Sequence, residues 1–585
     1  MPCFTFRSAP RRRRPTARVG TWLPHPSRLR RGGLAKGWDG VYLAVALLSL
    51  GCAFHAAAQP APDRPSKLPT TGPYRIAGLA IDALTGEPIR RASVAVLDEE
   101  DSHVIESVLS DNEGHFVLAG LAAAKYQLTA SKRGYRTAFY DEHDDYSTAI
   151  VTRADQDTSG LKFRLTPAAI LRGQVTGDGG DPVEGARILL FRKPRKPKLG
   201  ERITHVDSTT TDDTGAYEFG NLAAGDYLVA VTAEPWYSMH RPAKASGPTP
   251  NDEAAAALDV SYPVTYFDST TDEASATLIP LAAGEAEQAN ISLHAVPSLH
   301  LSVQLTRRQD GSLARPELRQ MIFGMDLSAE SMGPFELSTS AEAEFSGVAP
   351  GRYELAQGDP QRTVEIDATA DQQFGPTTGT PTVEVSGSLK SASGAALEHD
   401  FTVMLQSLDP ESHTLNLPTN ASSGVFRFPS VPPGKWAVTA FAAGKRLAVI
   451  AMSVGDRTRG GNVLDVGDRP LKIVLAVAQG DMRVEGLARK DGKGFAGAMV
   501  VLVPKDLGAI RELARRDQSD SDGSFSLRDT APGQYTVVAI EDGWNLDWSQ
   551  PGVIRRFLPR GTPVTVTDSS TKVVTMEGAV VVQSP

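Results

Sequence analysis

The chain repeats one short pattern five times, and this pattern limits the folds it can adopt. Its first copy lies in "DNEGHFVLAGLAAAKYQL", residues 111–128. With Phe116 as position 0, apolar residues follow at +2 and +5, a small residue at +8 and an aromatic residue at +10. We call this pattern the repeat frame. Its five copies are Phe116, Leu118, Leu121, Ala124, Tyr126; Tyr217, Phe219, Leu222, Gly225, Tyr227; Ala343, Phe345, Val348, Gly351, Tyr353; Phe426, Phe428, Val431, Gly434, Trp436; and Phe525, Leu527, Thr530, Gly533, Tyr535.

Each repeat frame predicts a strand, a tight turn and a second strand. Side chains at positions 0 and +2 share one face of an extended strand. The stretches "LAAGDY", "VPPGKW" and "TAPGQY" then place Gly or Pro where a tight turn needs an unusual or a fixed φ. Alternation of apolar and polar residues resumes after the turn, as in "YTVVA".

A glycine in an earlier alternating stretch precedes four of the five frames. From Gly78, Gly173, Gly387 and Gly486 to position 0 the separations are 38, 44, 39 and 39 residues. The third copy lacks both this glycine and the aromatic residue at position 0. Seven or so short strands per unit, with no long amphipathic helix, are typical of a β-sandwich.

We therefore predict an all-β chain, a tandem array of about five Ig-like or transthyretin-like β-sandwiches after a signal peptide. The length of 585 residues agrees with several domains, since one core rarely serves so long a chain. The predicted parts are a signal peptide at 1–58, a linker at 59–73, and sandwiches at 74–167, 168–295 (with a basic insertion at 192–198), 296–380 (divergent), 381–478 and 479–585.

The first 58 residues are predicted to direct export. They are rich in arginine, and the apolar run from Val41 to Phe54 is shorter than the roughly 20 residues that a membrane-spanning helix needs. Small residues end the run, so we expect cleavage between Ala58 and Gln59. A lipid anchor on Cys52 is the alternative. The mature chain is then expected in the periplasm, at the cell surface or outside the cell, with no transmembrane segment.

Cysteine content and charge exclude several classes of function. Cys3 and Cys52 are the only cysteines and both precede residue 59, so the mature chain has no disulfide and no Cys-ligated metal. The formal net charge is −9, and residues 1–58 hold ten of the 60 basic residues. The remainder is therefore more acidic still and is expected to repel nucleic acid and anionic lipid.

The combined pattern resembles the carboxypeptidase regulatory-like domain, a transthyretin-like (prealbumin-like) sandwich related to Cna B-type modules. The stretches that carry the resemblance are the Gly-x-Pro turns, the alternating Ala and Val that follow, the "D-x-x-G-x-F-x-L" turn and the "L-x-x-G-x-Y-x-L" corner. It is most specific in the first, second and fifth units. The resemblance implies a seven-stranded fold and a non-catalytic module with carbohydrate-binding or adhesive roles; fold alone does not assign function.

Aromatic residues near the predicted loops are candidates for stacking on sugar rings. Trp544 and Trp548 are four residues apart, so on a strand they would share a face about 13 Å from each other. Trp236 and Tyr237 follow the corresponding strand of the second unit. Planar rings cover the apolar faces of sugars well. Tryptophan also seals domain junctions and cores, so both interpretations are open.

Charged stretches give weaker candidates. The run "RKPRKPK" could bind anionic polysaccharide or headgroups, although its prolines favour an extended, solvated arm. The acidic turns "SDNEGHF", "TDDTGAY" and "SDSDGSF" are expected to cap their own backbone rather than bind calcium. We expect "DEHDDY" (141–146) to be solvated. The candidate anion-binding residues are Arg192, Lys193, Arg195, Lys196 and Lys198.

We predict a non-enzymatic protein of the cell envelope that acts in binding or adhesion, or as a spacer. Carbohydrate recognition through the loop aromatics is one alternative. A second, accessory to a zinc carboxypeptidase-type enzyme, depends on His103 and Glu106 in "HVIE", but residues three apart on a strand point to opposite faces. No motif for a nucleophile, a phosphate or a metal triad is present, so we expect no cofactor. Expected partners are polysaccharide or envelope proteins.

Overall fold

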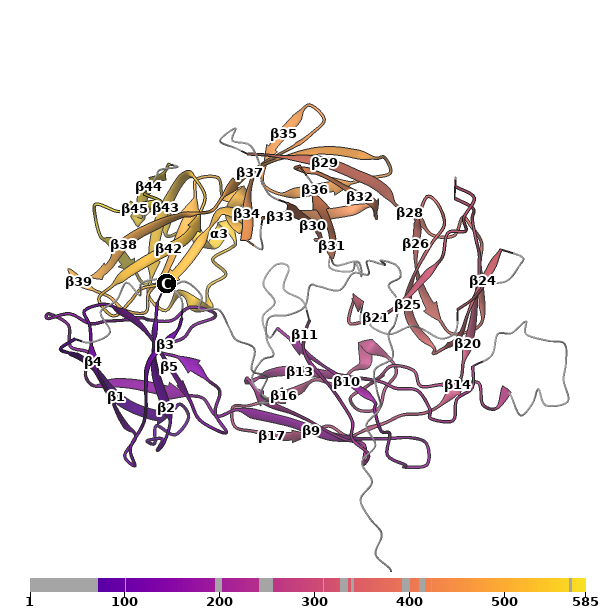
Figure 1. Cartoon of the computed structure of the whole chain (residues 1–585), viewed down its shortest axis with the longest axis horizontal. Helices are drawn as coiled ribbons and strands as arrows, with labels where there is room; N and C mark the ends of the chain where they lie inside the picture. The colour runs from indigo at the N-terminus through magenta and orange to yellow at the C-terminus, as the bar shows by residue number, and fades with distance from the viewer. Residues whose placement is uncertain are drawn as a thin grey trace, which may run out of the picture. The chain divides into compact units, whose positions relative to one another are not determined.

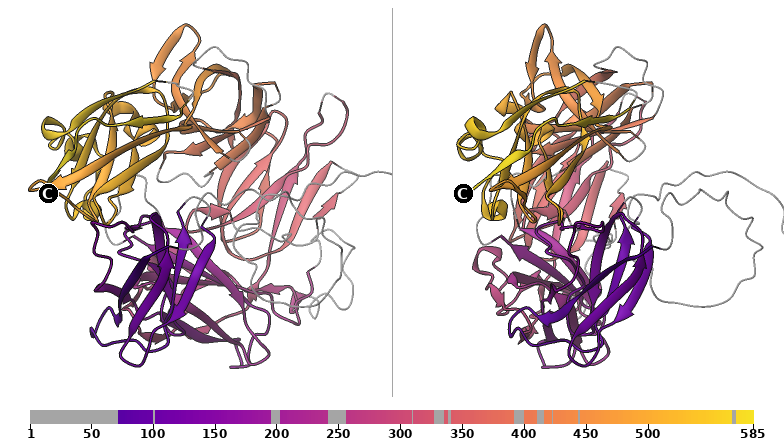
Figure 2. Two further views of the ribbon diagram at one scale, coloured as in Figure 1. Left: turned by 60° about the vertical axis from the view of Figure 1, so that its left-hand side comes forward. Right: turned by 90° about the vertical axis from the view of Figure 1, so that its left-hand side faces the viewer.

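The computed structural model describes residues 72–99, 102–194, 203–240, 256–308, 310–326, 335–337, 341–391, 400–409, 416–421, 423–442, 445–567 and 571–585. Strands dominate this part of the chain (Figures 1 and 2). The predicted all-β tandem architecture is therefore confirmed.

Five of the seven hydrophobic clusters in the described residues follow one another along the sequence, and we call them the cores. Their buried members span residues 76–165, 169–293, 299–374, 383–477 and 482–582. Each core is made by one contiguous stretch. The domain limits that we propose from the sequence fall between consecutive cores, and we use them to name the first to fifth sandwiches.

The first sandwich packs two sheets around the core that contains Phe116 and Tyr126. In one sheet, of order β4–β1–β8, β1 runs antiparallel to β4 and parallel to β8. The other has the order β3–β2–β5–β6, with β7 also paired to β5. The strands are β1 (Tyr74–Asp82), β2 (Ser93–Asp98), β3 (Val104–Leu109), β4 (His115–Leu121), β5 (Lys125–Ser131), β6 (Ala138–Phe139), β7 (Ile150–Val151) and β8 (Leu161–Leu165).

The second sandwich repeats this plan. Its sheets have the orders β12–β9–β17, with β18 also on β9, and β11–β10–β13–β15, with β16 also on β13; β14 pairs with β19. The elements are β9 (Ala169–Thr176), β10 (Arg187–Lys193), β11 (Thr204–Thr210), β12 (Ala216–Leu222), β13 (Gly225–Thr232), β14 (Val260–Ser261), β15 (Thr265–Tyr266), η1 (Glu273–Ser275), β16 (Ile279–Leu281), β17 (Ala286–Gln288) and β18 (Ile291–Ser292). By the limits above, β19 (Val296–Pro297) begins the third sandwich.

The third sandwich has sheets of order β23–β24–β20–β27 and β22–β21–β25–β26–β28. Its core includes Phe345 and Tyr353 of the divergent repeat frame. The strands are β20 (Leu299–Gln304), β21 (Glu317–Ile322), β22 (Met325–Asp326), β23 (Phe335–Leu337), β24 (Glu342–Val348), β25 (Gly351–Gln357), β26 (Arg362–Ala368), β27 (Gln372–Phe374) and β28 (Thr380–Pro381).

In the fourth sandwich the strands join into one nine-stranded sheet, because β34 pairs with both β33 and β37. The order is β31–β30–β33–β34–β37–β29–β32, with β35 on β34 and β36 on β33. The strands are β29 (Val383–Ser391), β30 (Phe401–Ser407), β31 (Asn416–Ala421), β32 (Val425–Val431), β33 (Gly434–Ala442), β34 (Lys445–Val454), β35 (Arg457–Gly460), β36 (Val463–Val466) and β37 (Leu471–Gln479).

The fifth sandwich is joined in the same way through β46, which pairs with β38 and β43. The order is β39–β38–β46–β43–β40–β41, with β42 and β45 on β38 and β44 on β43. Its elements are β38 (Met482–Lys490), β39 (Lys493–Gly494), β40 (Met499–Pro504), η2 (Leu507–Ala509), α2 (Ile510–Leu513), β41 (Arg515–Gln518), β42 (Ser524–Thr530), β43 (Gly533–Ile540), η3 (Gly543–Asn545), α3 (Pro551–Ile554), η4 (Leu558–Arg560), β44 (Thr562–Val566), β45 (Val573–Thr575) and β46 (Val580–Gln583).

The repeated glycine exists because an aromatic ring lies over it. In the cross-strand register Gly78, Gly173, Gly387 and Gly486 pair directly with the residue at position 0. A Cβ atom added to Gly387 or Gly486 would lie 2.5 Å from the ring of Phe426 or Phe525, closer than real carbon contacts allow. At Gly387 the neighbouring parallel strand also presents the Ile473 carbonyl, and at Gly486 the Met576 sulfur lies 3.2 Å from the added atom. Glycine is therefore required by the close approach of a ring, and at Gly387 of a backbone as well.

In the third unit the large and the small residue of this cross-strand pair are exchanged. There β20 pairs Val303 with Ala343, the residue at position 0. Both side chains are fully buried. The larger side chain now stands on the first strand and the smaller one at position 0, which explains why this unit lacks the glycine and the aromatic residue together.

The aromatic residue at +10 ties the turn to the core in all five units. Its polar atom donates a hydrogen bond to the backbone carbonyl four residues earlier, as in the tyrosine corner of immunoglobulin-like sandwiches. The pairs are Tyr126 with Ala122 (3.2 Å), Tyr227 with Ala223 (2.7 Å), Tyr353 with Ala349 (2.7 Å), Trp436 with Pro432 (3.1 Å) and Tyr535 with Ala531 (2.8 Å).

Replacing Gly387 by Ala is expected to destabilise the fourth sandwich by about 1–3 kcal/mol, because the added methyl overpacks against Phe426 and a carbonyl. Gly467→Ala in the same sandwich is the matched control, since no atom lies within 4 Å of its added Cβ. Hydrogen exchange of peptides from β29 and β32 measures the effect on this sandwich alone. Equal protection in the two variants would contradict the explanation given for the glycine.

Candidate functional site

Trp236 and Tyr237 lie in the loop that follows β13. Trp236 is 93% exposed, the most exposed large apolar side chain in the described part of the chain. The rings of Trp236 and Tyr237 meet edge to face, with centroids 5.6 Å apart and an interplanar angle of 84°. This loop therefore presents an aromatic face to solvent.

Trp544 and Trp548 have a different environment. The strand assumed for them is not formed: Trp544 lies in η3, and Trp548 follows it in a turn. Trp544 is only 8% exposed and stacks on the ring of His143 in the first sandwich at a centroid distance of 5.2 Å. The Arg516 guanidinium lies 4.8 Å from the ring centroid of Trp548 and 5.8 Å from that of Trp544. The two tryptophans thus lie at the contact between the first and fifth sandwiches.

One turn of the fifth sandwich forms hydrogen bonds to the first sandwich. Both its backbone and its side chains take part. The Asp520 carboxylate accepts from Lys125 Nζ at 2.7 Å and from the Ala149 amide at 3.2 Å. The Ser521 amide donates to the Ala149 carbonyl at 3.0 Å, and the Val151 amide donates to Ser521 Oγ at 2.8 Å. The two chain segments lie side by side at this contact, although they are about 370 residues apart in sequence.

Gln518 extends this contact into the run that we expected to be solvated. Its Nε2 donates to Thr148 Oγ1 at 2.7 Å and to the Asp141 carbonyl at 2.5 Å. Gln518 is 1% exposed, and His143 Nδ1 lies 3.2 Å from its Oε1. The run at 141–146 therefore contacts the fifth sandwich through His143 and Tyr146, while its four acidic residues stay exposed, as expected.

Ion pairs surround this contact, and a cleft lies beside it. The pairs are Arg516–Asp144 (3.0 Å), Arg153–Asp522 (3.0 Å) and Arg528–Glu99 (2.7 Å). The cleft has a volume of about 450 Å³ and is lined from both sandwiches by Glu99, Tyr146, Arg515, Arg516, Asp517 and Trp548 among others. Burial, together with the charge of Asp520, raises the pKa of the Asp517 carboxyl to about 7, against the hydrogen bond from the Ser526 amide.

A chain of alternating carboxylates and imidazoles joins the second and third sandwiches. His240 contacts Glu234 through Nε2 at 2.7 Å and Asp259 through Nδ1 at 3.0 Å. His300 contacts the other oxygen of Asp259 through Nε2 at 3.0 Å and Glu344 through Nδ1 at 3.0 Å. We call these five residues the histidine relay.

The hydroxyl of Ser298 lies next to the histidine relay, but Ser298 is buried. Ser298 Oγ lies 3.4 Å from Nδ1 of His240. Ser298 is 8% exposed, and the same nitrogen is engaged by Asp259. A nucleophile must reach its substrate, so this arrangement fits a structural junction better than an active site.

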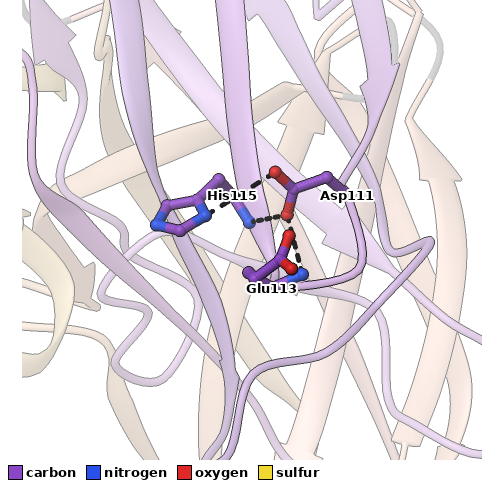
Figure 3. A group of neighbouring side chains, drawn as sticks. All are labelled: Asp111, Glu113 and His115. Carbon is purple, nitrogen blue, oxygen red and sulfur yellow. Dashed lines mark hydrogen bonds and ion pairs between the residues drawn. The ribbon is translucent and has the colours of Figure 1, made fainter.

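Asp111, Glu113 and His115 form the one group of three possible metal ligands found in the described residues (Figure 3). Asp111 Oδ1 accepts from the amides of Glu113 (3.0 Å) and His115 (2.7 Å), so its carboxylate caps its own turn, as the sequence predicts. All three side chains are exposed, which is ordinary for an acidic turn. His103, just before β3, and Glu106 within it do not belong to this group.

The remaining predicted residues are only partly covered by the structure. Arg192 and Lys193 end β10 on its exposed side, and Arg192 donates to the Ala224 carbonyl at 3.0 Å. Arg195, Lys196 and Lys198 lie outside the described residues, as do Cys52, Ala58 and Gln59. Anion binding by this arm and cleavage of the leader stay predictions.

The contact between the first and fifth sandwiches has no distinctive signal in the sequence. Asp520 stands five residues before position 0, as Asp111 and Asp212 do in their units. In the fifth unit a second acid, Asp522, caps the turn by accepting from the Ser524 amide at 2.9 Å. A second acid at that offset is not peculiar to this unit, since Glu113 stands there in the first.

The fold and these contacts define a tandem β-sandwich protein whose sandwiches meet through specific polar junctions. In the described residues no helix has the length and apolar character to span a membrane. Residues 75–166 and 170–252 match the family model of the carboxypeptidase regulatory-like domain. The match falls on the first two sandwiches and agrees with the resemblance noted in the sequence.

Individual relatives add little beyond the family. Colossin-A from Dictyostelium discoideum is 20% identical over 507 residues, which cover 78% of this chain but 4% of that protein. The Bacillus anthracis TIE protein is 12% identical and covers 69% of this chain and 73% of its own, with a TM-score of 0.17. The minor pilin GBS52 of Streptococcus agalactiae is 14% identical and covers 38% and 97%, with a TM-score of 0.19. TM-scores this low support no transfer of arrangement or function.

Asp517 is expected to make the fifth sandwich less stable as pH rises. Its pKa is about 7 in the folded protein and near 3.8 when unfolded, so the folded state binds the proton more tightly. The free energy of unfolding should therefore fall from about pH 4 to pH 7 and level off above it. Hydrogen exchange of β41 and β42, corrected for intrinsic rates, measures this. Asp517→Asn should remove most of the fall, whereas the exposed Asp542→Asn should keep it; an unchanged slope in Asp517→Asn would count against the assignment.

Proposed function

We propose that the chain is an exported, non-catalytic protein of the cell envelope that acts in binding or adhesion, or as a spacer. The observation that carries the proposal is the serial arrangement of five cores, each closed by the same corner aromatic. Such domains hold their loops rigidly, and binding residues are commonly found on loops of a rigid scaffold. Its destination is the periplasm, the cell surface or the extracellular medium.

The chemistry of the described residues supports a non-enzymatic role. The buried polar groups of the junctions are engaged with one another: Asp520 with Lys125, Gln518 with Thr148, and the histidine relay with its own carboxylates. Catalysis needs a reactive group that is both activated and accessible. Asp517, which has a raised pKa and lines the cleft, is engaged by the Ser526 amide.

Carbohydrate recognition is the second candidate, and one observation favours it. Trp236 keeps 93% of its surface exposed on a loop, where burial would have been favourable for so large a ring. With Tyr237 it offers two perpendicular ring faces, suited to the apolar faces of a sugar. Trp544 has its face covered by His143, so this candidate depends on the Trp236 loop.

The N-terminus of the protein from its native cells tests export. We expect mass spectrometry of the fractionated protein to give Gln59 as the first residue, in the envelope or the medium. An acylated Cys52 at the N-terminus would replace cleavage at Ala58 with lipid anchoring and keep the envelope location. Recovery in the cytoplasm with residues 1–58 intact would contradict the proposal.

Glycan binding is tested by titrating the chain from Gln59 onward against a panel of envelope polysaccharides. Trp236→Ala should weaken binding about 5- to 150-fold, by analogy with the roughly 1–3 kcal/mol that stacking of a base on one aromatic ring is worth. Trp548→Ala is the matched control and should leave binding unchanged. Absence of binding by the unaltered chain, or equal loss in both variants, would remove this second candidate and leave the spacer role.

A further inference from the structure

The first, second and fifth sandwiches have an aspartate five residues before position 0. In the fifth sandwich this aspartate also bonds to another sandwich. Asp111 and Asp212 accept hydrogen bonds from amides of their own turns, Asp212 from Thr214 and Ala216 at 2.9 Å each. Asp520, at the equivalent position, accepts from Ser524 Oγ of its own turn at 3.0 Å and also from Lys125 and Ala149 of the first sandwich. The backbone of this turn is capped by Asp522, which accepts from the Ser524 amide.

The residues on both sides of this contact are shielded from solvent. Gln518, Ser519 and Asp520 are 1%, 0% and 7% exposed, and across the contact Thr148 and Ala149 are 2% and 4% exposed. Buried polar groups cost free energy unless they are hydrogen-bonded. Gln518 and Asp520 find their partners on the first sandwich, so separating the two sandwiches would leave these groups to be satisfied by water.

The lysine that meets Asp520 is not a general feature of the repeat. Lys125 stands at position +9, where the second, third and fifth units have Asp226, Arg352 and Gln534. The carboxylate of Asp520 keeps the pKa of Lys125 above its ordinary value, against the burial that would lower it. The fourth unit also has a lysine there, Lys435, but its side chain is exposed.

We propose that residues 515–529 of the fifth sandwich form a docking surface whose occupant is the first sandwich of the same chain, latching the two together. The segments between successive sandwiches are short: β8 ends at Leu165 and β9 begins at Ala169, and β37 ends at Gln479 and β38 begins at Met482. Within one chain the partner is tethered, so the contact forms without the entropy cost of bringing two molecules together. The latch goes beyond the proposed function and does not depend on it.

A disulfide trap tests the latch in a background that has no other cysteine, the chain from Gln59 onward. Ala149→Cys with Ser521→Cys joins positions whose backbones are hydrogen-bonded, a separation that a disulfide can span. We expect near-complete oxidation within the monomer at low protein concentration. The control pair is Ala149→Cys with Asp213→Cys, which uses the equivalent turn position of the second sandwich and should stay reduced.

Two outcomes of the trap would overturn the proposal. One is oxidation no greater than in the control pair. The other is disulfides that form only between chains and increase with protein concentration, which would make a second copy the occupant of the surface. Neither outcome bears on export or on glycan binding, so failure of the latch is distinguishable from failure of the proposed function.

A second measurement protects the test if the cysteine pair impairs folding. In the otherwise unaltered mature chain, Lys125→Met should raise the exchange rates of the Ser521 and Val151 amides about ten-fold, because a charged hydrogen bond is lost at the contact. Lys435→Met, at the same frame position of the fourth sandwich, should leave them unchanged. Exchange of the Ser521 amide as fast as that of Asp213 in the unaltered chain would overturn the latch.

Discussion

A buried aromatic residue that bonds to the carbonyl four residues before it holds each sandwich together. The ring fills the core, and its donor satisfies a backbone oxygen that the tight turn would leave without a strand partner. Trp436 replaces tyrosine in the fourth unit without loss of this bond, since its indole N–H reaches Pro432 at 3.1 Å. Phenylalanine could fill the space but could not satisfy the carbonyl. The requirement is therefore bulk together with a donor, which explains why position +10 tolerates exchange of Tyr for Trp.

Much of the fold could be predicted from the sequence because the constraints on it are local. The frame offsets reflect strand alternation and one tight turn, and Gly387 faces Phe426 in a register that their spacing of 39 residues implies. In the third unit the pair Val303 and Ala343 replaces the glycine and the aromatic residue. The packing is kept, but the repeat is harder to recognise in the sequence. The predicted sites were less accessible to such reasoning. Whether Trp544 is free or covered depends on His143, about 400 residues earlier, and no local pattern carries that information.

The junctions differ from one another in their chemistry. The second and third sandwiches meet through the histidine relay. They also meet through an aromatic contact, in which the ring centroids of Phe191 and Phe323 are 4.9 Å apart. Between the fourth and fifth, Arg446 pairs with Glu512, a carboxyl whose pKa burial raises although the arginine opposes the shift. The first and fifth meet through Lys125 and Asp520. Because each junction uses different buried partners, exchanging one sandwich for another would leave charges unpaired, a cost that uniform repeats do not face.

Two of the candidate tryptophans lie at a junction between sandwiches, whereas Trp236 does not. Trp544 and Trp548 are accounted for by Arg516, Tyr146 and His143 at a junction. The histidine relay accounts for Glu234 and His240, which stand on either side of Trp236 in the sequence. Because these two residues bond to each other, the backbone that carries Trp236 is held by a contact that does not involve its ring. A rigid loop that holds a large ring in water loses hydrophobic stabilisation, and the loss is offset if a ligand covers the ring. Binding, if the array performs it, is therefore best sought at Trp236.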